Sequence, residues 1–173
     1  MKEDGRIVAF SAGMLLLRLV LGIVLFARGA LILFNWWTGQ GMSSYSDYLS
    51  LGGLDFFPGA VGWAWVIGLV QFVGGILLVF GLMTRLSALL NAIVIILLMS
   101  IVEWNGAFFI AVYGISQSGS VDYQGGVEYS MLLVGTCLAL FLAGAGKYSI
   151  DAGFAPKPKK EKKEEKPLEK KAD

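Results

Sequence analysis

Residues 7–34 read IVAFSAGMLLLRLVLGIVLFARGALILF, an apolar run that only two charged side chains interrupt, Arg18 and Arg28. A helix needs roughly 20 apolar residues, each rising 1.5 Å, to cross the hydrocarbon core of a bilayer. The run therefore predicts a membrane-spanning helix. An arginine at membrane depth costs free energy unless it is paired or hydrated, so other parts of the chain must supply partners for both guanidinium groups.

The composition places the whole chain among membrane proteins. Of its 173 residues, 56% are hydrophobic, more than in ordinary soluble domains. The absence of histidine excludes a histidine-ligated haem or zinc and a histidine-based triad, and the single cysteine, Cys137, excludes an intramolecular disulfide. We expect no metal and no covalently bound cofactor. A redox role would need a diffusible cofactor, such as a membrane quinone, or a partner chain.

Three more apolar runs follow the first. We predict an all-α integral membrane protein, a bundle of four transmembrane helices in one domain over residues 1–152. The helices are expected near residues 7–34, 62–82, 86–105 and 127–148, with outer loops at 35–61 and 106–126. Within the second loop, the apolar part 108–115 fits either a short strand or a segment lying on the membrane surface. Residues 153–173 are mostly Lys, Glu and Pro and predict a disordered tail.

Charges and tryptophans agree on the orientation of the bundle. Outside the apolar runs, Lys and Arg occur near both termini and at Arg85, and the two outer loops contain none. The positive-inside rule then predicts that both termini are cytoplasmic. All five tryptophans fall at the opposite ends of the helices, as in an interfacial aromatic belt. We expect a multi-pass protein of the inner or plasma membrane, surrounded by lipid and by other membrane subunits, with no nucleic-acid partner.

The helical rise gives the expected level of each polar side chain. Counted from the cytoplasmic ends, Arg18 and Gln71 lie roughly 15 Å deep, and Arg28, Glu103 and Glu128 lie roughly 25 to 30 Å deep. We hypothesise that Arg18 hydrogen-bonds Gln71 and that Arg28 pairs with Glu128 and Glu103. Small residues share helix faces with these groups and predict that those faces point into the bundle: Gly22 and Gly29; Ala64, Gly68 and Gly75; Gly135, Ala139 and Gly146.

Each polar group has a structural and a functional interpretation. Paired charges can lock helices together, or they can form a ligand site, which is the default reading for ionisable residues inside a membrane. An arginine matched only by an amide keeps spare donors for an anion or a quinone oxygen. The candidate ligand- or quinone-binding residues are therefore Arg18, Gln71, Arg28, Glu128 and Glu103, and no catalytic residue can be assigned.

Three segments resemble the DoxX/DoxD-like family of four-helix membrane proteins: LLLRLVLGIVLFARGALILF (15–34), QFVGGILLVFGLMTR (71–85) and GGVEYSMLLVGTCLALFLAGAGKYSID (125–151). The resemblance covers about residues 12–152. The family includes the membrane subunit of thiosulfate:quinone oxidoreductase, which acts with a second subunit. The resemblance implies that Arg18, Arg28 and Glu128 match the family's intramembrane polar positions. The family often has glutamate where this chain has Gln71, which removes a counter-ion for Arg18.

Two functions remain open at this point. The first is a membrane subunit of a quinone-linked oxidoreductase, in which Arg18 and Gln71 hold a quinone oxygen and Arg28 attracts a small anionic donor such as thiosulfate. The alternative is a non-catalytic structural or assembly subunit of a larger respiratory complex. A solute carrier is disfavoured, because the sequence shows no inverted repeats and no proline-broken helices.

Overall fold

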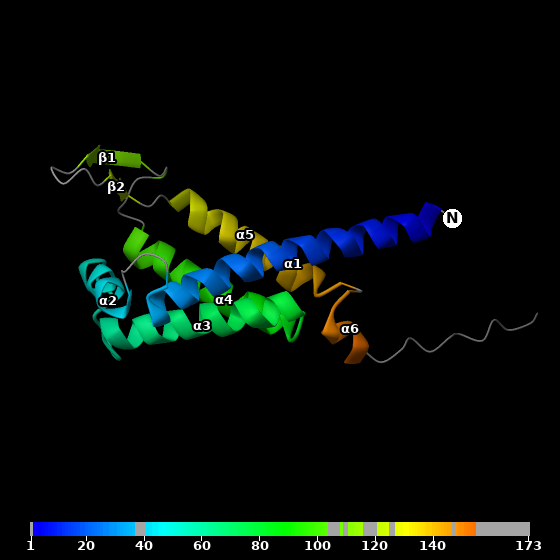
Figure 1. Cartoon of the computed structure of the whole chain (residues 1–173), viewed down its shortest axis with the longest axis horizontal. Coiled ribbons are helices and arrows are strands. Elements are labelled where there is room, and N and C mark those ends of the chain that lie inside the picture. The colour runs from blue at the N-terminus through cyan, green and yellow to red at the C-terminus, as the bar shows by residue number, and fades with distance from the viewer. Residues whose placement is uncertain are drawn as a thin grey trace, which may run out of the picture.

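The computed structural model describes residues 2–36, 41–103, 108, 111–115, 121–124, 127–146 and 148–154. The elements are α1 (Lys2–Phe34), α2 (Gly41–Leu51), α3 (Ala60–Phe80), α4 (Thr84–Leu98), the π-helix η1 (Met99–Glu103), β1 (Ala111–Ile115), β2 (Val121–Gln124), α5 (Val127–Ala143) and α6 (Ile150–Phe154). The described chain is predominantly helical, as predicted. We call the end of the bundle with the N-terminus and α6 the terminal end, and the end with α2 and the strands the hairpin end (Figure 1).

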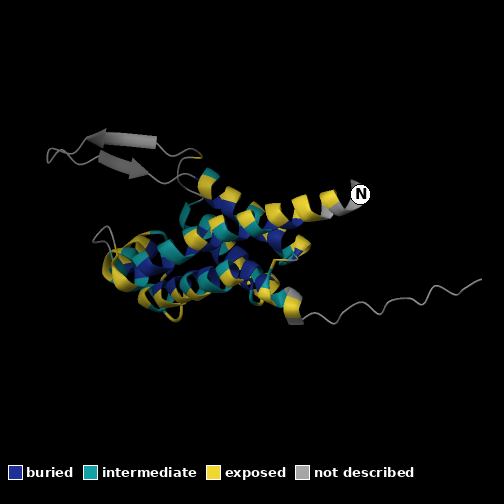
Figure 2. Cartoon of the chain, turned by 45° about the vertical axis from the view of Figure 1, so that its right-hand side comes forward, coloured by how far each residue is buried: buried dark blue, intermediate teal, exposed yellow. Residues whose placement is uncertain are grey.

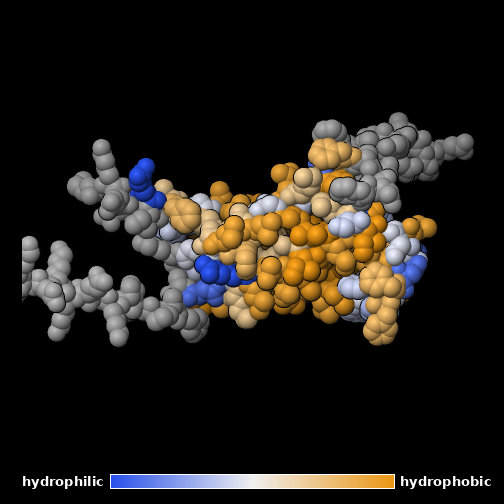
Figure 3. Space-filling view, turned by 180° about the vertical axis from the view of Figure 1, so that it is seen from behind, coloured by the Kyte–Doolittle hydropathy of each residue, from blue (hydrophilic) through white to orange (hydrophobic). Residues whose placement is uncertain are grey.

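Three helical stretches are long and apolar enough to cross a membrane: Val8–Phe34, Ala60–Phe80 and Thr84–Glu103. Helix α5 is also apolar but has only 17 residues. The surface carries a broad hydrophobic band across the helices, and hydrophilic residues gather toward its two ends (Figure 3). This pattern is that of a protein whose helices are surrounded by lipid.

Two helix boundaries differ from the predicted ones in ways that matter for the site. Helix α1 begins at Lys2, well before the apolar run. Helix α5 ends at Ala143, because Gly144 and Gly146 adopt φ values of 79° and 73° that favour glycine and stop the helix. The chain beyond Ala143 is therefore free to fold back over the terminal end.

The two predicted loops contain secondary structure. Residues 35–61 include α2, whose sequence GMSSYSDYLSL has low helix propensity. Leu49 of α2 and the following Leu54 are fully buried in one cluster with Ile67 of α3, so tertiary packing stabilises this helix. For residues 108–115 the sequence left a strand or a surface-lying segment open. The structure has a strand there, β1, which pairs antiparallel with β2. Most of the predicted tail, residues 155–173, lies outside the described residues.

Helices α1 and α3 touch through glycines. A Cβ added to Gly22 would lie 2.8 Å from Val79 Cγ2 and 2.9 Å from the Gly75 carbonyl oxygen. A Cβ on Gly29 would collide with the backbone of Phe72. The small residues predicted on these two helices therefore do allow close approach, and the contact fixes which residues of α1 and α3 share a level.

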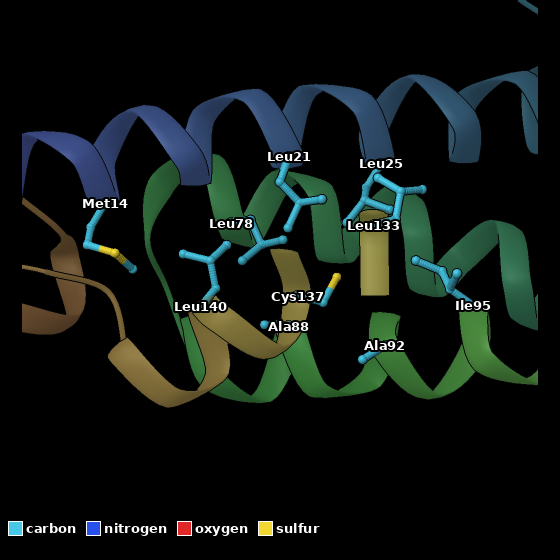
Figure 4. Packing of buried hydrophobic residues seen from close by; sticks show 10 residues of the cluster. All are labelled: Met14, Leu21, Leu25, Leu78, Ala88, Ala92, Ile95, Leu133, Cys137 and Leu140. Carbon is cyan, nitrogen blue, oxygen red and sulfur yellow. The ribbon is translucent and has the colours of Figure 1, made fainter. Parts of the chain in front are cut away.

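The main core cluster joins α1, α3, α4 and α5 (Figure 4). Cys137 is fully buried in it and packs there as a small apolar side chain. The predicted inward stripe of α5 is wrong, because Gly135 and Ala139 are exposed and no atom lies within 4 Å of a Cβ at Gly135. The buried face of α5 consists of larger side chains that fill the space toward α4: Val127, Ser130, Leu133, Cys137 and Leu140. Figure 2 shows the buried faces turned toward one another.

We predict that Gly29→Ala lowers the free energy of unfolding by about 1 to 3 kcal/mol, because the added methyl group overpacks the α1–α3 contact. Gly135→Ala is the matched control: it adds the same methyl group to an open helix face, and should be neutral or stabilising by up to about 1 kcal/mol. Unfolding of the purified protein in mixed detergent micelles measures both. Equal effects of the two substitutions would contradict the close contact.

Candidate functional site

Arg18 donates hydrogen bonds from both terminal nitrogens to backbone carbonyl groups, and its Nε has no partner among the described residues. Its side chain is buried, with 2% exposed. Nη1 donates to the carbonyl oxygen of Ala145 at 2.8 Å, and Nη2 donates to that of Tyr148 at 2.7 Å. The predicted hydrogen bond to Gln71 is wrong, since neither polar atom of the Gln71 side chain has a partner among the described residues.

The register of α1 against α3 explains this correction. Gly22 packs at Val79 and Gly29 packs at Phe72, so Arg18 reaches the terminal end of α3 instead of its middle. A Cβ on Gly81 would lie 2.5 Å from Arg18 Nη1. The sequence-based depths placed the start of the first helix level with the end of the second, whereas α1 extends past the end of α3 at the terminal end (Figure 1).

Asp151 completes a clasp beside Arg18. The N–H groups of Met83 and Thr84 donate to its two carboxylate oxygens at 2.8 and 2.9 Å, and its own N–H donates to the Gly81 carbonyl at 3.0 Å. Burial alone would raise the pKa of Asp151, but these hydrogen bonds and the nearby Arg18 charge outweigh it and lower the pKa. The carboxylate thus caps the first turn of α4.

Arg28 lies near four aromatic and acidic side chains toward the hairpin end. Its guanidinium carbon is 5.3 Å from the ring centre of Tyr129 on α5, a cation–π contact. The ring centres of Tyr45 and Tyr48 on α2 are 6.0 Å apart. Arg28 and Glu103 both lie close enough to these phenols to interact with them electrostatically. We call Arg28, Tyr45, Tyr48, Glu103 and Tyr129 the arginine–tyrosine cluster.

Two buried polar atoms of this cluster have no hydrogen-bond partner within the described part of the chain: the Tyr45 hydroxyl and Glu103 Oε2. Burial raises the pKa of Tyr45 to about 12, and the Arg28 charge opposes this shift only in part. Tyr45 therefore stays protonated at neutral pH and can donate a hydrogen bond. A buried unpaired donor and acceptor cost free energy unless a ligand or water completes them.

A π-helix positions the acidic member of the cluster. Helix α4 passes into η1, whose last residue is Glu103. Such wide turns are rare and occur often at functional sites, because they rotate the side chains that follow. Val102 of η1 packs where a Cβ on Gly52 would lie, so the end of α2 holds η1 in place.

Gln71 and Glu128 occupy positions close to the cluster. Gln71 is fully buried, and it lies at the level of Arg28, because their chain neighbours Phe72 and Gly29 are in contact. Glu128 precedes Tyr129 at the start of α5, and its N–H donates to the Phe108 carbonyl at 3.1 Å. The pairing of Arg28 with Glu128 and Glu103 stays a prediction, as does ligand binding by any of these residues.

The three tyrosines were not among the residues predicted from the sequence. Tyr45 and Tyr48 lie in a segment that was expected to be a loop, and Tyr129 reads as an ordinary interfacial aromatic residue. Only their spacing within α2, three residues apart on one helix face, could have indicated a shared contact. Among the described residues, no group of three or more acidic or thiol side chains could hold a metal ion.

Comparison with known proteins identifies the family of the chain. The model of the DoxX family matches residues 13–104. A Bacillus subtilis (strain 168) protein named "Putative oxidoreductase CatD" is 31% identical over 143 residues, which are 83% of this chain and 87% of that protein. The chain belongs to the DoxX family. No solved structure matches the chain.

The DoxX match includes both arginines and most of the arginine–tyrosine cluster. Residues 13–104 include Arg18, Arg28, Tyr45, Tyr48, Gln71 and Glu103. The remaining member of the cluster and the clasp carboxylate come from beyond that range, namely Tyr129 and Asp151. The chain of this DoxX protein therefore brings its last helices back to complete both groups.

The clasp predicts a loss of stability in acid. Asp151 has a folded pKa below its ordinary value of 3.8, so its contribution is full above that value and is lost as the pH falls through the lowered folded pKa. The melting temperature of the wild type should therefore fall as the pH drops below 3.8. Asp151→Asn should melt lower at neutral pH and lose less in acid. Asp47→Asn, an exposed carboxylate on α2, is the control and should follow the wild type.

The buried phenol predicts a late titration. The near-ultraviolet absorbance of tyrosinate should show one group ionising near pH 12, and Tyr45→Phe should remove that step. Between the ordinary pKa of 10 and about 12 the folded chain keeps a proton that the unfolded chain releases. Stability should therefore fall as the pH rises through this range, by about 1.4 kcal/mol per pH unit. Loss of a step near pH 10 in the variant would contradict the burial of Tyr45.

Proposed function

We propose that this DoxX protein is the membrane subunit of a quinone-linked oxidoreductase and that the arginine–tyrosine cluster holds the quinone ring. The observation that supports the proposal is the pair of unpaired buried atoms, the Tyr45 hydroxyl and Glu103 Oε2, next to the charge of Arg28. A quinone carbonyl oxygen accepts hydrogen bonds, and a quinol hydroxyl donates one. The cluster offers groups that suit both redox states.

The site moves away from Arg18, where the sequence first suggested it. The two carbonyl groups that Arg18 binds leave it a structural role in the clasp. Gln71 stays with the proposed site, because it lies at the level of Arg28 and its amide lacks a partner among the described residues. An unpaired amide inside an apolar bundle is costly, and a ring carbonyl could accept from its nitrogen.

The chemistry assigns a role to each group. Reduction of a quinone to a quinol consumes two electrons and two protons. In the proposed mechanism Tyr45 donates its hydrogen bond to one carbonyl oxygen, and Arg28 stabilises the negative charge that develops there. Glu103 passes protons to the reduced ring. The two electrons would come from a small sulfur anion such as thiosulfate, directly or through a partner chain.

The proposed topology has four crossings, with α5 as the fourth, and both termini in the cytoplasm. The 17 residues of α5 span about 26 Å, slightly less than a typical hydrocarbon core. The support for the orientation is the concentration of Lys and Arg at the terminal end and their absence from the segments 35–61 and 106–126. The membrane would be the plasma membrane.

A structural or assembly subunit is the second candidate function. The observation that favours it is the exposed small-residue face of α5, formed by Gly135, Ala139 and Ala143. Small residues spaced four apart let another membrane helix approach closely. In that case the chain would bind large partner subunits without holding a quinone.

The quinone content of the purified protein tests the proposal. The chain, purified in mild detergent, should carry close to one quinone per chain. We predict that Arg28→Gln and Tyr45→Phe each lower the retained quinone at least about tenfold, since each removes a hydrogen bond worth ~1.5 kcal/mol or more.

Tyr148→Phe is the matched control, because it removes a phenol hydroxyl at the terminal end, on an exposed side chain far from the cluster. It should keep the wild-type quinone content. Quinone loss in this control equal to that in Tyr45→Phe would contradict the site. A wild type without quinone that co-purifies with large membrane subunits would favour the second candidate.

A further inference from the structure

A cavity of about 460 Å³ opens at the terminal end, away from the arginine–tyrosine cluster. One wall comes from the α3–α4 turn and the start of α4, with Met83, Arg85 and Leu86. The facing wall comes from the chain that follows α5, with Gly144 and Asp151. Because α4 is a candidate membrane span that begins at Thr84, the cavity lies where a span meets the lipid headgroups.

The cavity carries a positive charge that the described residues do not neutralise. Arg85 is exposed and lies over Gly144, where a Cβ would be 3.2 Å from its Nε. No carboxylate in the described part of the chain forms an ion pair with Arg85. Asp151, on the facing wall, is already occupied by two N–H donors and by the charge of Arg18. The remaining charge suits an anion.

An apolar groove of about 280 Å³ continues from this cavity along α3 and α4. The two share Met83 and Leu86 in their walls. From Leu77 to Leu69 the groove follows α3 for about 12 Å. Its polar wall residues, Ser87 and Asn91, are buried, so that the accessible surface of the groove is almost wholly apolar.

We propose that the cavity and the groove together bind one phospholipid. Its phosphodiester lies at Arg85, and one acyl chain lies between α3 and α4. A charged chamber that opens into an apolar groove matches an amphiphile with an anionic head. Basic pockets between membrane helices are known to take lipid headgroups in this way. An uncharged quinone would leave Arg85 without a partner.

Lipid titration of the delipidated full-length protein tests this site. Native mass spectrometry should show a first bound dioleoyl phosphatidylglycerol that is at least about tenfold tighter than dioleoylglycerol, which lacks the phosphate. Arg85→Gln should lower the affinity for phosphatidylglycerol at least about tenfold, and Arg85→Lys should keep most of it. The control is Arg6→Gln, which removes an exposed charge at the same end of the bundle but outside the cavity.

Each alternative has its own signature. Equal losses in Arg85→Gln and Arg6→Gln would show general attraction to an anionic surface and overturn the site. Equal affinity for dioleoylglycerol and phosphatidylglycerol would do the same without relying on any variant. If inorganic phosphate bound as tightly as the lipid, the acyl chain in the groove would contribute nothing to binding, and the proposed phospholipid site would be wrong. Displacement of bound phosphatidylglycerol by a membrane quinone would assign the groove to that cofactor.

Discussion

The backbone contact between α1 and α3 is the constraint on which the rest of the bundle depends. Glycines let the two helices approach until the carbonyl of Gly75 and the backbone of Phe72 touch α1. Such a contact tolerates no sliding, because a shift by one residue would place side chains where only hydrogen fits. The level of every polar group on α1 follows from it.

That register separates the two arginines of α1 into different roles. Arg18 reaches the terminal end, where backbone carbonyls accept from both of its Nη atoms without adding a second charge to the bundle. Arg28 lies toward the hairpin end, near phenols and Glu103, where it has a ring contact with Tyr129 and unpaired neighbours. The clasp at the terminal end is held by several hydrogen bonds, whereas the arginine–tyrosine cluster keeps a buried donor and a buried acceptor without partners among the described residues.

Much of the fold could be predicted from the sequence, because the apolar runs and their small residues specify helices and close contacts directly. The position of Arg18 along the bundle axis could not be predicted, because counting residues from assumed helix ends ignores how far α1 extends past α3. The inward face of α5 could not be predicted either, because Gly135 has the spacing of a packing residue but lies on an open face. Tyr45 was missed because its helix forms through burial and not through propensity.

The clasp at the terminal end also constrains how the protein is made. Arg18 lies in α1, but the carbonyls that accept from it belong to Ala145 and Tyr148, which are 127 and 130 residues later in the chain. Domains form during synthesis from the N-terminus onward. The span that carries Arg18 is therefore made before its carbonyl partners, and its charge lacks them until Ala145 and Tyr148 have been translated. A chain cut short before these residues would carry Arg18 without its two carbonyl partners.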